Sequence, residues 1–69
     1  MTPAQCRAAR KLIDWSRSML ARQSDLSKDT IRDFEKGRTV PAANKLAAIR
    51  AALERAGVRF VEVDREKLG

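Results

Sequence analysis

The chain has 69 residues, of which 43% are hydrophobic, and it carries a formal net charge of +6 with a pI near 10.5. A chain of this length forms one domain at most, and its small core favours an additional source of stability. One cysteine and no histidine exclude an internal disulfide and a zinc finger. We therefore expect no cofactor, and we expect a second subunit to supply the additional stability.

The excess of positive charge lies in the first part of the chain. Residues 1–57 contain 12 Lys and Arg against six Asp and Glu, whereas residues 58–69 contain three of each. This distribution is typical of a domain that binds a polyanion. The sequence shows neither a signal-peptide pattern nor an apolar run long enough to cross a bilayer, which predicts a soluble, cytoplasmic protein without membrane contact.

A first helix is predicted to begin at Thr2 and Pro3. Threonine caps a helix N-terminus well, and proline suits the first helical position. Cys6 and Ala9 stand three apart on the face that we expect to be buried. Asp14 is expected to end this helix.

Residues 16–37 predict two short helices joined by a tight turn. Ser16 and Ser27 are suitable N-caps, Asp25 interrupts the apolar pattern between them, and Gly37 provides a C-terminal stop. Two helices of this length bury little surface alone. They are typical of a helix-turn-helix, whose first helix crosses the DNA backbone and whose second helix lies in the major groove.

The segment 15–41 resembles the XRE family of Cro- and phage-repressor-type DNA-binding domains. The residues that match are Leu20-Ala21, Leu26, Ser27, Thr30-Ile31, Glu35, Gly37 and Pro41, with Arg10 and Trp15-Ser16 extending the match toward the N-terminus. The resemblance covers roughly residues 4 to 57. It implies an all-α, compact four-helix, repressor-like helix-turn-helix domain over residues 1–57.

The resemblance also implies an ion pair between the first and third helices, formed by Arg10 and Glu35. Three residues depart from the family pattern. Asp25 stands where the family prefers glycine, Arg17 where it usually has glutamine, and Met19 where it usually has a polar residue. Aspartate tolerates a left-handed backbone better than most residues, so we expect the turn to survive.

The second helix of the motif is expected over residues 28–36. Ile31 and Phe34 define its inner face, and the opposite face is expected to meet the bases. Arg32 can donate two hydrogen bonds to the edge of a guanine. Three roles are open for Asp29 and Asp33 on this face. They accept hydrogen bonds from cytosine amino groups, or they orient the neighbouring cations by salt bridges. Alternatively, they are solvated and disfavour binding to other DNA sequences. The expected base-reading residues are Lys28, Asp29, Arg32 and Asp33.

Further polar side chains of residues 16–45 are expected to contact DNA phosphates. The resemblance implies that the loop 37–41 and the start of the next helix touch the sugar-phosphate backbone. An ordinary solvated loop is the alternative. The expected phosphate-binding residues are Ser16, Arg17, Arg22, Ser27, Thr30, Lys36, Arg38, Thr39 and Lys45.

A fourth helix is predicted over residues 42–56. Leu46, Ile49 and Leu53 recur at helical spacing and predict one buried face. Trp15 is expected to pack in the core beside this helix, since stacking on a base would require an exposed ring.

The segment 58–63 is β-branched and aromatic and predicts one short strand. A single strand leaves its backbone edges unpaired, so we expect antiparallel pairing with the same strand of a second subunit. The alternative is a tail that docks alone or frays. The expected dimerisation residues of this C-terminal strand and tail, residues 58–69, are Val58, Phe60, Val61 and Val63.

These features predict a sequence-specific regulator of transcription that binds double-stranded DNA. We expect a homodimer on a palindromic operator, acting as a repressor or an activator and associated with the nucleoid when bound to DNA. The alternative is an antitoxin-type or other protein-interaction module whose C-terminal strand adds to a partner protein's sheet. The lack of His, of Tyr and of a Gly-rich phosphate loop argues against an enzyme. The three aromatic residues stand at core-like spacings, which does not favour RNA binding.

Overall fold

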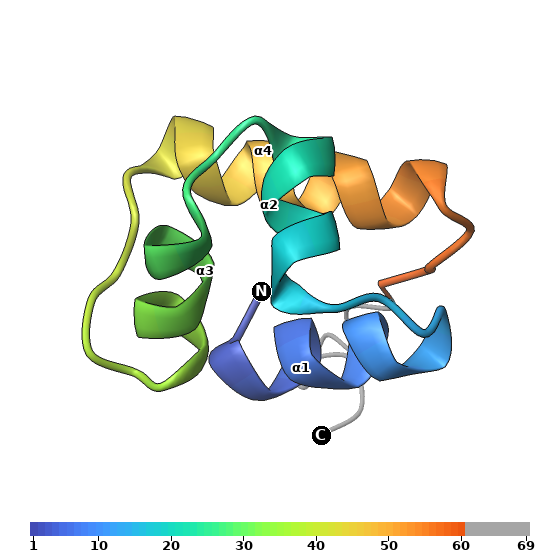
Figure 1. Cartoon of the computed structure of the whole chain (residues 1–69), viewed down its shortest axis with the longest axis horizontal. Helices are drawn as coiled ribbons and strands as arrows, with labels where there is room; N and C mark the ends of the chain where they lie inside the picture. Colours follow the sequence, from blue (N-terminus) through green and yellow to red (C-terminus); the bar gives the residue numbers. More distant parts are fainter. Residues whose placement is uncertain (61–69) are drawn as a thin grey trace, which may run out of the picture.

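The computed structural model of the protein describes residues 1–60. Within this range the chain forms four helices and no strand: α1 (Pro3–Leu12), α2 (Arg17–Ser24), α3 (Lys28–Glu35) and α4 (Ala43–Arg55). Figure 1 shows α1 and α4 along opposite edges of the molecule, with α2 and α3 between them. The four predicted helices are confirmed. None of them is long and apolar enough to cross a membrane.

Each of the first three helices begins at a side-chain cap. The hydroxyl of Thr2 accepts a hydrogen bond from the backbone N–H of Gln5 at 3.1 Å, and the Gln5 side chain accepts one from the Thr2 N–H at 2.8 Å. The hydroxyls of Ser16 and Ser27 each accept from the backbone N–H three residues later, at 3.1 Å. A cap of this kind contributes about 1 kcal/mol to helix stability. The capping serines therefore fix where α2 and α3 begin.

Two aspartates and two glycines, one of them Gly57 after α4, have a positive φ at helix ends. Asp25, with φ of 58° and ψ of 39°, ends α2, and its N–H donates to the carbonyls of Ala21 and Arg22. The turn thus forms with aspartate in the place of the family's glycine, as predicted. Gly37, with φ of 73°, follows the end of α3. Asp14, predicted to end the first helix, lies two residues after α1 and is a second left-handed aspartate, with φ of 57°.

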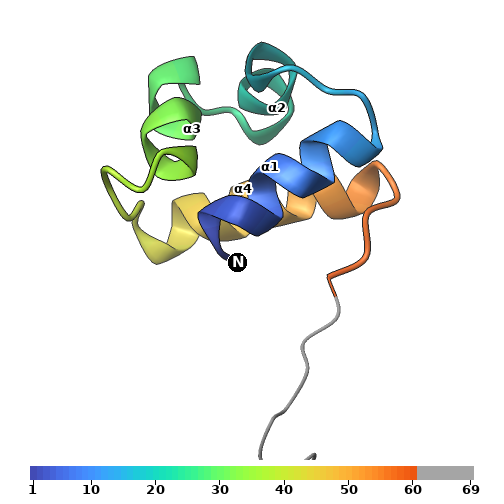
Figure 2. The same ribbon diagram turned by 90° about the horizontal axis from the view of Figure 1, so that it is seen from below.

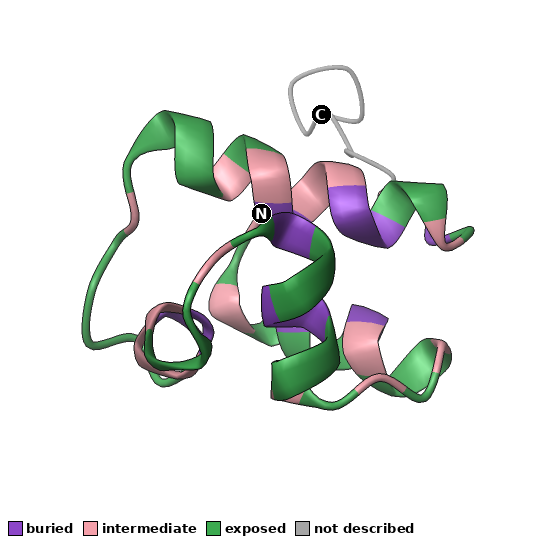
Figure 3. Ribbon diagram, turned by 45° about the horizontal axis from the view of Figure 1, so that its top comes forward, coloured by how far each residue is buried: buried purple, intermediate pink, exposed green. Residues whose placement is uncertain are grey.

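The core combines side chains of all four helices. The largest fully buried apolar side chains are Leu20, Ile31, Ile49 and Leu53. Helix α2 packs against both α3 and α4, and α1 packs against α3. Figure 2 shows α2 and α3 together on one side of α1 and α4, and in Figure 3 the buried parts of the helices turn inward. Burial of side chains of this size stabilises the fold by about 1.5–3 kcal/mol each. This packing decides which face of α3 stays outside.

The expected C-terminal strand is not formed in its described part, residues 58–60. Val58 is buried, and its backbone N–H donates to the carbonyl of Leu53 at 3.1 Å. This hydrogen bond belongs to the end of α4, so the group that a strand would use for pairing is already occupied. Phe60 is partly buried against the core. The predictions for Val61 and Val63 lie outside the described residues.

Candidate nucleic-acid interface

The outer face of α3 is open to solvent. Ile31 and Phe34 lie in the core and hold the inner face of the helix. Lys28 and Asp29 are exposed at the start of the helix, and the side chain of Arg32 is 40% exposed in its middle. A helix presented in this way has a free polar face of the kind that enters a major groove.

Arg32 lies between two carboxylates on this face. Its Nη1 is 3.2 Å from Oδ1 of Asp29, and its Nε is 3.4 Å from Oδ1 of Asp33. Nη1 of Arg38 lies 3.9 Å from the same oxygen of Asp33. Exposed ion pairs of this kind contribute about 0–1 kcal/mol, so their main effect is to restrict the directions that Arg32 takes. Among the three interpretations of the aspartates, this geometry favours orientation of the neighbouring cation.

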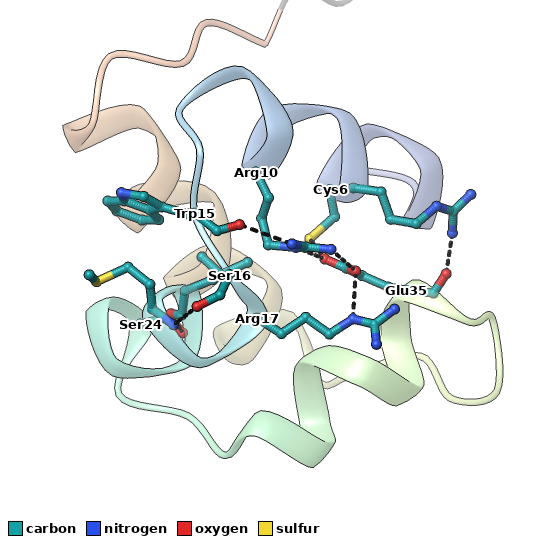
Figure 4. A network of polar contacts seen from close by, with 10 residues as sticks. Cys6, Arg10, Trp15, Ser16, Arg17, Ser24 and Glu35 are labelled. Carbon is teal, nitrogen blue, oxygen red and sulfur yellow. Dashed lines mark hydrogen bonds and ion pairs between the residues drawn. The ribbon is translucent and has the colours of Figure 1, made fainter.

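A buried ion pair lies behind this face, where α1, α2 and α3 meet. The carboxylate of Glu35 is fully buried and accepts two hydrogen bonds from Arg10, from Nε at 2.6 Å and from Nη2 at 2.7 Å. The remaining nitrogen, Nη1 of Arg10, donates to the backbone carbonyl of Trp15 at 3.0 Å. Figure 4 shows these contacts joining α1 to α3. The two residues named as a structural ion pair are therefore in direct contact.

Three further residues join this cluster. Nε of Arg17 donates to the Glu35 carboxylate at 3.1 Å, and the thiol of Cys6 donates to it at 3.2 Å. Nη1 of Arg7 donates to the backbone carbonyl of Glu35. The sequence predicts Arg17 only as a phosphate contact and Cys6 only as a buried residue, and it predicts no role for Arg7. The spacing of Arg7 and Arg10, three apart on one helix, is the signal that could have placed Arg7 here.

The cluster shifts the pKa values of its members. Burial alone would raise the pKa of Glu35, but hydrogen bonds from Arg10, Cys6 and Arg17 outweigh it and hold the pKa below its ordinary value. Burial, together with the hydrogen bond to Glu35, raises the pKa of the Cys6 thiol to about 12. Cys6 is therefore a neutral hydrogen-bond donor and not a nucleophile. The hydrogen bond to Glu35 raises the pKa of Arg10. The contacts of this cluster join three helices, α1, α2 and α3.

The residues predicted to contact phosphates fall into two groups. Ser16 and Ser27 cap helices, Thr30 shares a 2.7 Å hydrogen bond with the Ser27 hydroxyl, and Arg17 is half-buried against the carboxylate of Glu35. The other predicted residues are exposed: Arg22, Lys36, Arg38, Thr39 and Lys45. The part of the chain from residue 1 to 60 holds no group of three or more His, Cys, Asp and Glu suited to a metal ion.

Four short helices, with a tight turn between the second and third and an open polar face on the third, define a helix-turn-helix DNA-binding domain. A family model described as helix-turn-helix matches residues 7–57. The protein therefore belongs to the XRE-type helix-turn-helix family, and it is a DNA-binding regulator. The resemblance seen in the sequence is confirmed. This family is not normally enzymatic. A comparison with curated proteins finds no match to this chain.

Proposed function

We propose that this protein is a sequence-specific regulator of transcription that acts as a homodimer on a palindromic operator. The observation that carries the proposal is the position of Arg32. It stands on the outer face of α3 between Asp29 and Asp33, while Ile31 and Phe34 fix the helix on the core. A guanidinium held in this way is ready to meet a base edge in the major groove.

Base reading is assigned to the exposed face of α3. Arg32 donates two hydrogen bonds to O6 and N7 of a guanine. Lys28, exposed at the start of the helix, reaches a neighbouring base or phosphate. Asp29 and Asp33 orient Arg32, and a carboxylate oxygen that faces the groove accepts from a cytosine amino group.

Phosphate binding is assigned to the polar residues that flank this face. Arg38 and Thr39 are exposed in the loop between α3 and α4, and Lys45 is exposed in the first turn of α4. Contacts from these residues set the register of the protein on the duplex without reading its sequence. Release of counterions makes this part of the affinity depend on salt.

Dimerisation is assigned to the C-terminal segment and the groove beside it. An apolar groove of about 180 Å³ lies between α1 and residues 58–60, lined on the helix by Ala8 and Leu12. Leu12 is 79% exposed, and Phe60 lines the other wall. We take this exposed apolar surface as the contact region of the proposed dimer. A twofold dimer formed here would place two copies of α3 in successive major grooves, about 34 Å apart.

The same groove supports one alternative. An apolar segment of a different protein could occupy it, as in an antitoxin-type module whose C-terminal segment binds a partner. Size-exclusion chromatography with light scattering on the purified protein separates the two functions. A stable dimer favours the homodimeric regulator, and a monomer favours the interaction module.

Selection of binding sites from a random DNA pool tests the proposed function. The proposal expects a palindromic consensus with at least one conserved guanine in each half. Arg32→Ala protein, selected in parallel, should lose the preference at that guanine. Enrichment of no common sequence would contradict the proposal. The proposed function places the protein in the cytoplasm, on the nucleoid.

A further inference from the structure

Val40 is the most exposed large apolar side chain among residues 1–60. It is 86% exposed, against 79% for Leu12 and 36% for Met19. Leu12 lies in the groove assigned to the dimer, and the sulfur of Met19 lies 3.7 Å from Nε2 of Gln23. Single exposed apolar residues are common on protein surfaces, so the position of Val40 decides whether it has a role.

The loop of residues 36–42, which contains Val40, continues the outer face of α3. The backbone N–H of Arg38 donates to the carbonyl of Asp33 at 2.9 Å, and Nη1 of Arg38 lies 3.9 Å from Oδ1 of Asp33. The start of the loop is therefore held against the end of α3. Figures 1 and 2 both show this loop at the outer edge of the molecule, beside α3. Val40 thus follows, two residues later, an arginine tied to the face that we assign to DNA.

The side chain of Val40 is presented in a narrow range of directions. Pro41 has a fixed φ, and it restricts the residue before it to extended conformations. Valine is also stiff at χ1, because its side chain branches at Cβ. A side chain restricted in this way loses little conformational entropy when it makes a contact. Val40 is therefore exposed and already positioned for a ligand.

The neighbours of Val40 suit phosphates, but Val40 itself does not. Arg38 and Thr39 are exposed and polar, whereas a valine side chain offers a phosphate no hydrogen-bond donor. The apolar group that a duplex presents in its major groove is the C5 methyl group of thymine. Because the loop flanks the helix assigned to the groove, Val40 lies at the edge of the groove in the proposed complex. Contact there removes apolar surface of both groups from water, which is favourable.

We propose that Val40 contacts the C5 methyl group of a thymine in the operator and thereby reads one base pair from the loop. The contact adds a specificity-determining residue outside α3. This inference rests on the proposed function, because its ligand is a base of the same duplex. Deoxyribose carbons are also apolar, but contact with them would not depend on the base. The test therefore has to change the methyl group alone.

Replacement of thymine by deoxyuridine removes the C5 methyl group and keeps the base pair and the phosphates. The probe is the duplex enriched from the random pool, with one thymine of a half-site replaced in each version. Affinity is measured by fluorescence anisotropy. At one thymine, the replacement should weaken binding of the unmodified protein about fourfold, the effect of one buried methyl group.

Val40→Ala should remove this dependence on the methyl group. The variant should bind the thymine duplex and the deoxyuridine duplex equally, with the affinity that the unmodified protein has for the deoxyuridine duplex. Val40→Ile keeps an apolar, β-branched side chain and should keep the ratio of the two affinities. Thr39→Ala is the matched control from the same loop, and it should weaken both duplexes alike. Because Val40 is exposed, its substitutions should leave the melting temperature unchanged.

The outcomes distinguish this inference from the proposed function. If the pool yields no common sequence, the proposed function fails, and this inference fails with it. If an operator is enriched but deoxyuridine weakens binding at none of its thymines, only this inference is overturned. If Val40→Ala keeps the ratio of the two affinities, another residue contacts the methyl group, which also overturns it. A changed oligomeric state of Val40→Ala without DNA, measured by light scattering, would assign Val40 to a protein contact instead.

Discussion

The guanidinium of Arg10 donates from Nε and Nη2 to the two carboxylate oxygens of Glu35, at 2.6 and 2.7 Å. The side chain of Arg10 is 12% exposed and that of Glu35 is 0% exposed. Placing two charges in such surroundings costs solvation, so the pair is weak support for net stability. Its geometric effect is clear, because it fixes α3 against α1 and thereby the orientation of the exposed face of α3.

Removal of one partner should destabilise the protein strongly. Arg10→Ala leaves the Glu35 carboxylate buried with fewer donors and should lower the free energy of unfolding by about 3–5 kcal/mol. Urea unfolding followed by circular dichroism measures this loss. Arg55→Ala, on the exposed surface, should change the same quantity by about 0.5 kcal/mol or less. Equal effects of the two substitutions would show that the ion pair does not hold the fold.

Stability should decline in acid because of Glu35. Hydrogen bonds from Arg10, Cys6 and Arg17 overcome the effect of burial and hold the folded pKa of Glu35 below its ordinary value of 4.5. The unfolded chain therefore takes up a proton at higher pH than the folded protein does. The stabilising contribution is complete above the ordinary value and is lost as the pH falls through the folded pKa.

Urea midpoints measured from about pH 6 to about pH 3 report this decline. Glu35→Gln should lower the midpoint near neutrality and reduce its dependence on acid. Glu54→Gln is the control, since Glu54 is an exposed residue of α4 paired with Arg50 at 3.5 Å. An acid profile that stays the same in Glu35→Gln would exclude Glu35 as its source.

The thiol of Cys6 should be inert in the folded protein. Burial and the hydrogen bond to Glu35 raise its pKa to about 12, so almost no thiolate forms near pH 8. Iodoacetamide should modify the native protein only at the rate at which the chain opens, and it should react rapidly in urea. Fast labelling without denaturant would mean that the side chain is not enclosed by α1 and α3.

The helices could be predicted from the sequence because their signals are local. Thr2, Ser16 and Ser27 lie three residues before the N–H groups that they cap, and Gly37 lies directly after Lys36, the C-cap of α3. The inner face of α3 followed from the spacing of its apolar residues in the same way. Such signals need no knowledge of which helix packs on which.

The arginine cluster could not be derived from local spacing, because its members come from three helices. Arg7 and Arg17 meet Glu35 only after the helices pack. The described part of the predicted C-terminal strand, residues 58–60, does not form a strand for a related reason. Val58 is buried and Phe60 is partly buried, as apolar residues favour, but the N–H of Val58 donates to the carbonyl of Leu53 at the end of α4. Whether such a competing hydrogen bond forms depends on how the chain folds, so the local sequence pattern does not reveal it.

In the proposed function, the exposed face of α3 reads bases, whereas the loop after α3 binds phosphates. Arg32 lies on that face between two carboxylates, and Arg38 lies in the loop, 3.9 Å from Asp33. Arg32 therefore represents the proposed base-reading role and Arg38 the proposed phosphate-binding role. Their loss should affect DNA binding in different ways.

The most direct test compares Arg32→Ala and Arg38→Ala on a selected operator and on every single-base variant of it, at several salt concentrations. Arg32→Ala should cost about 1–3 kcal/mol on the operator and abolish discrimination at one base position. Arg38→Ala should weaken binding to all sequences alike and reduce the salt slope by about 0.9 for each protomer. Equal losses from both substitutions on every sequence would contradict the account.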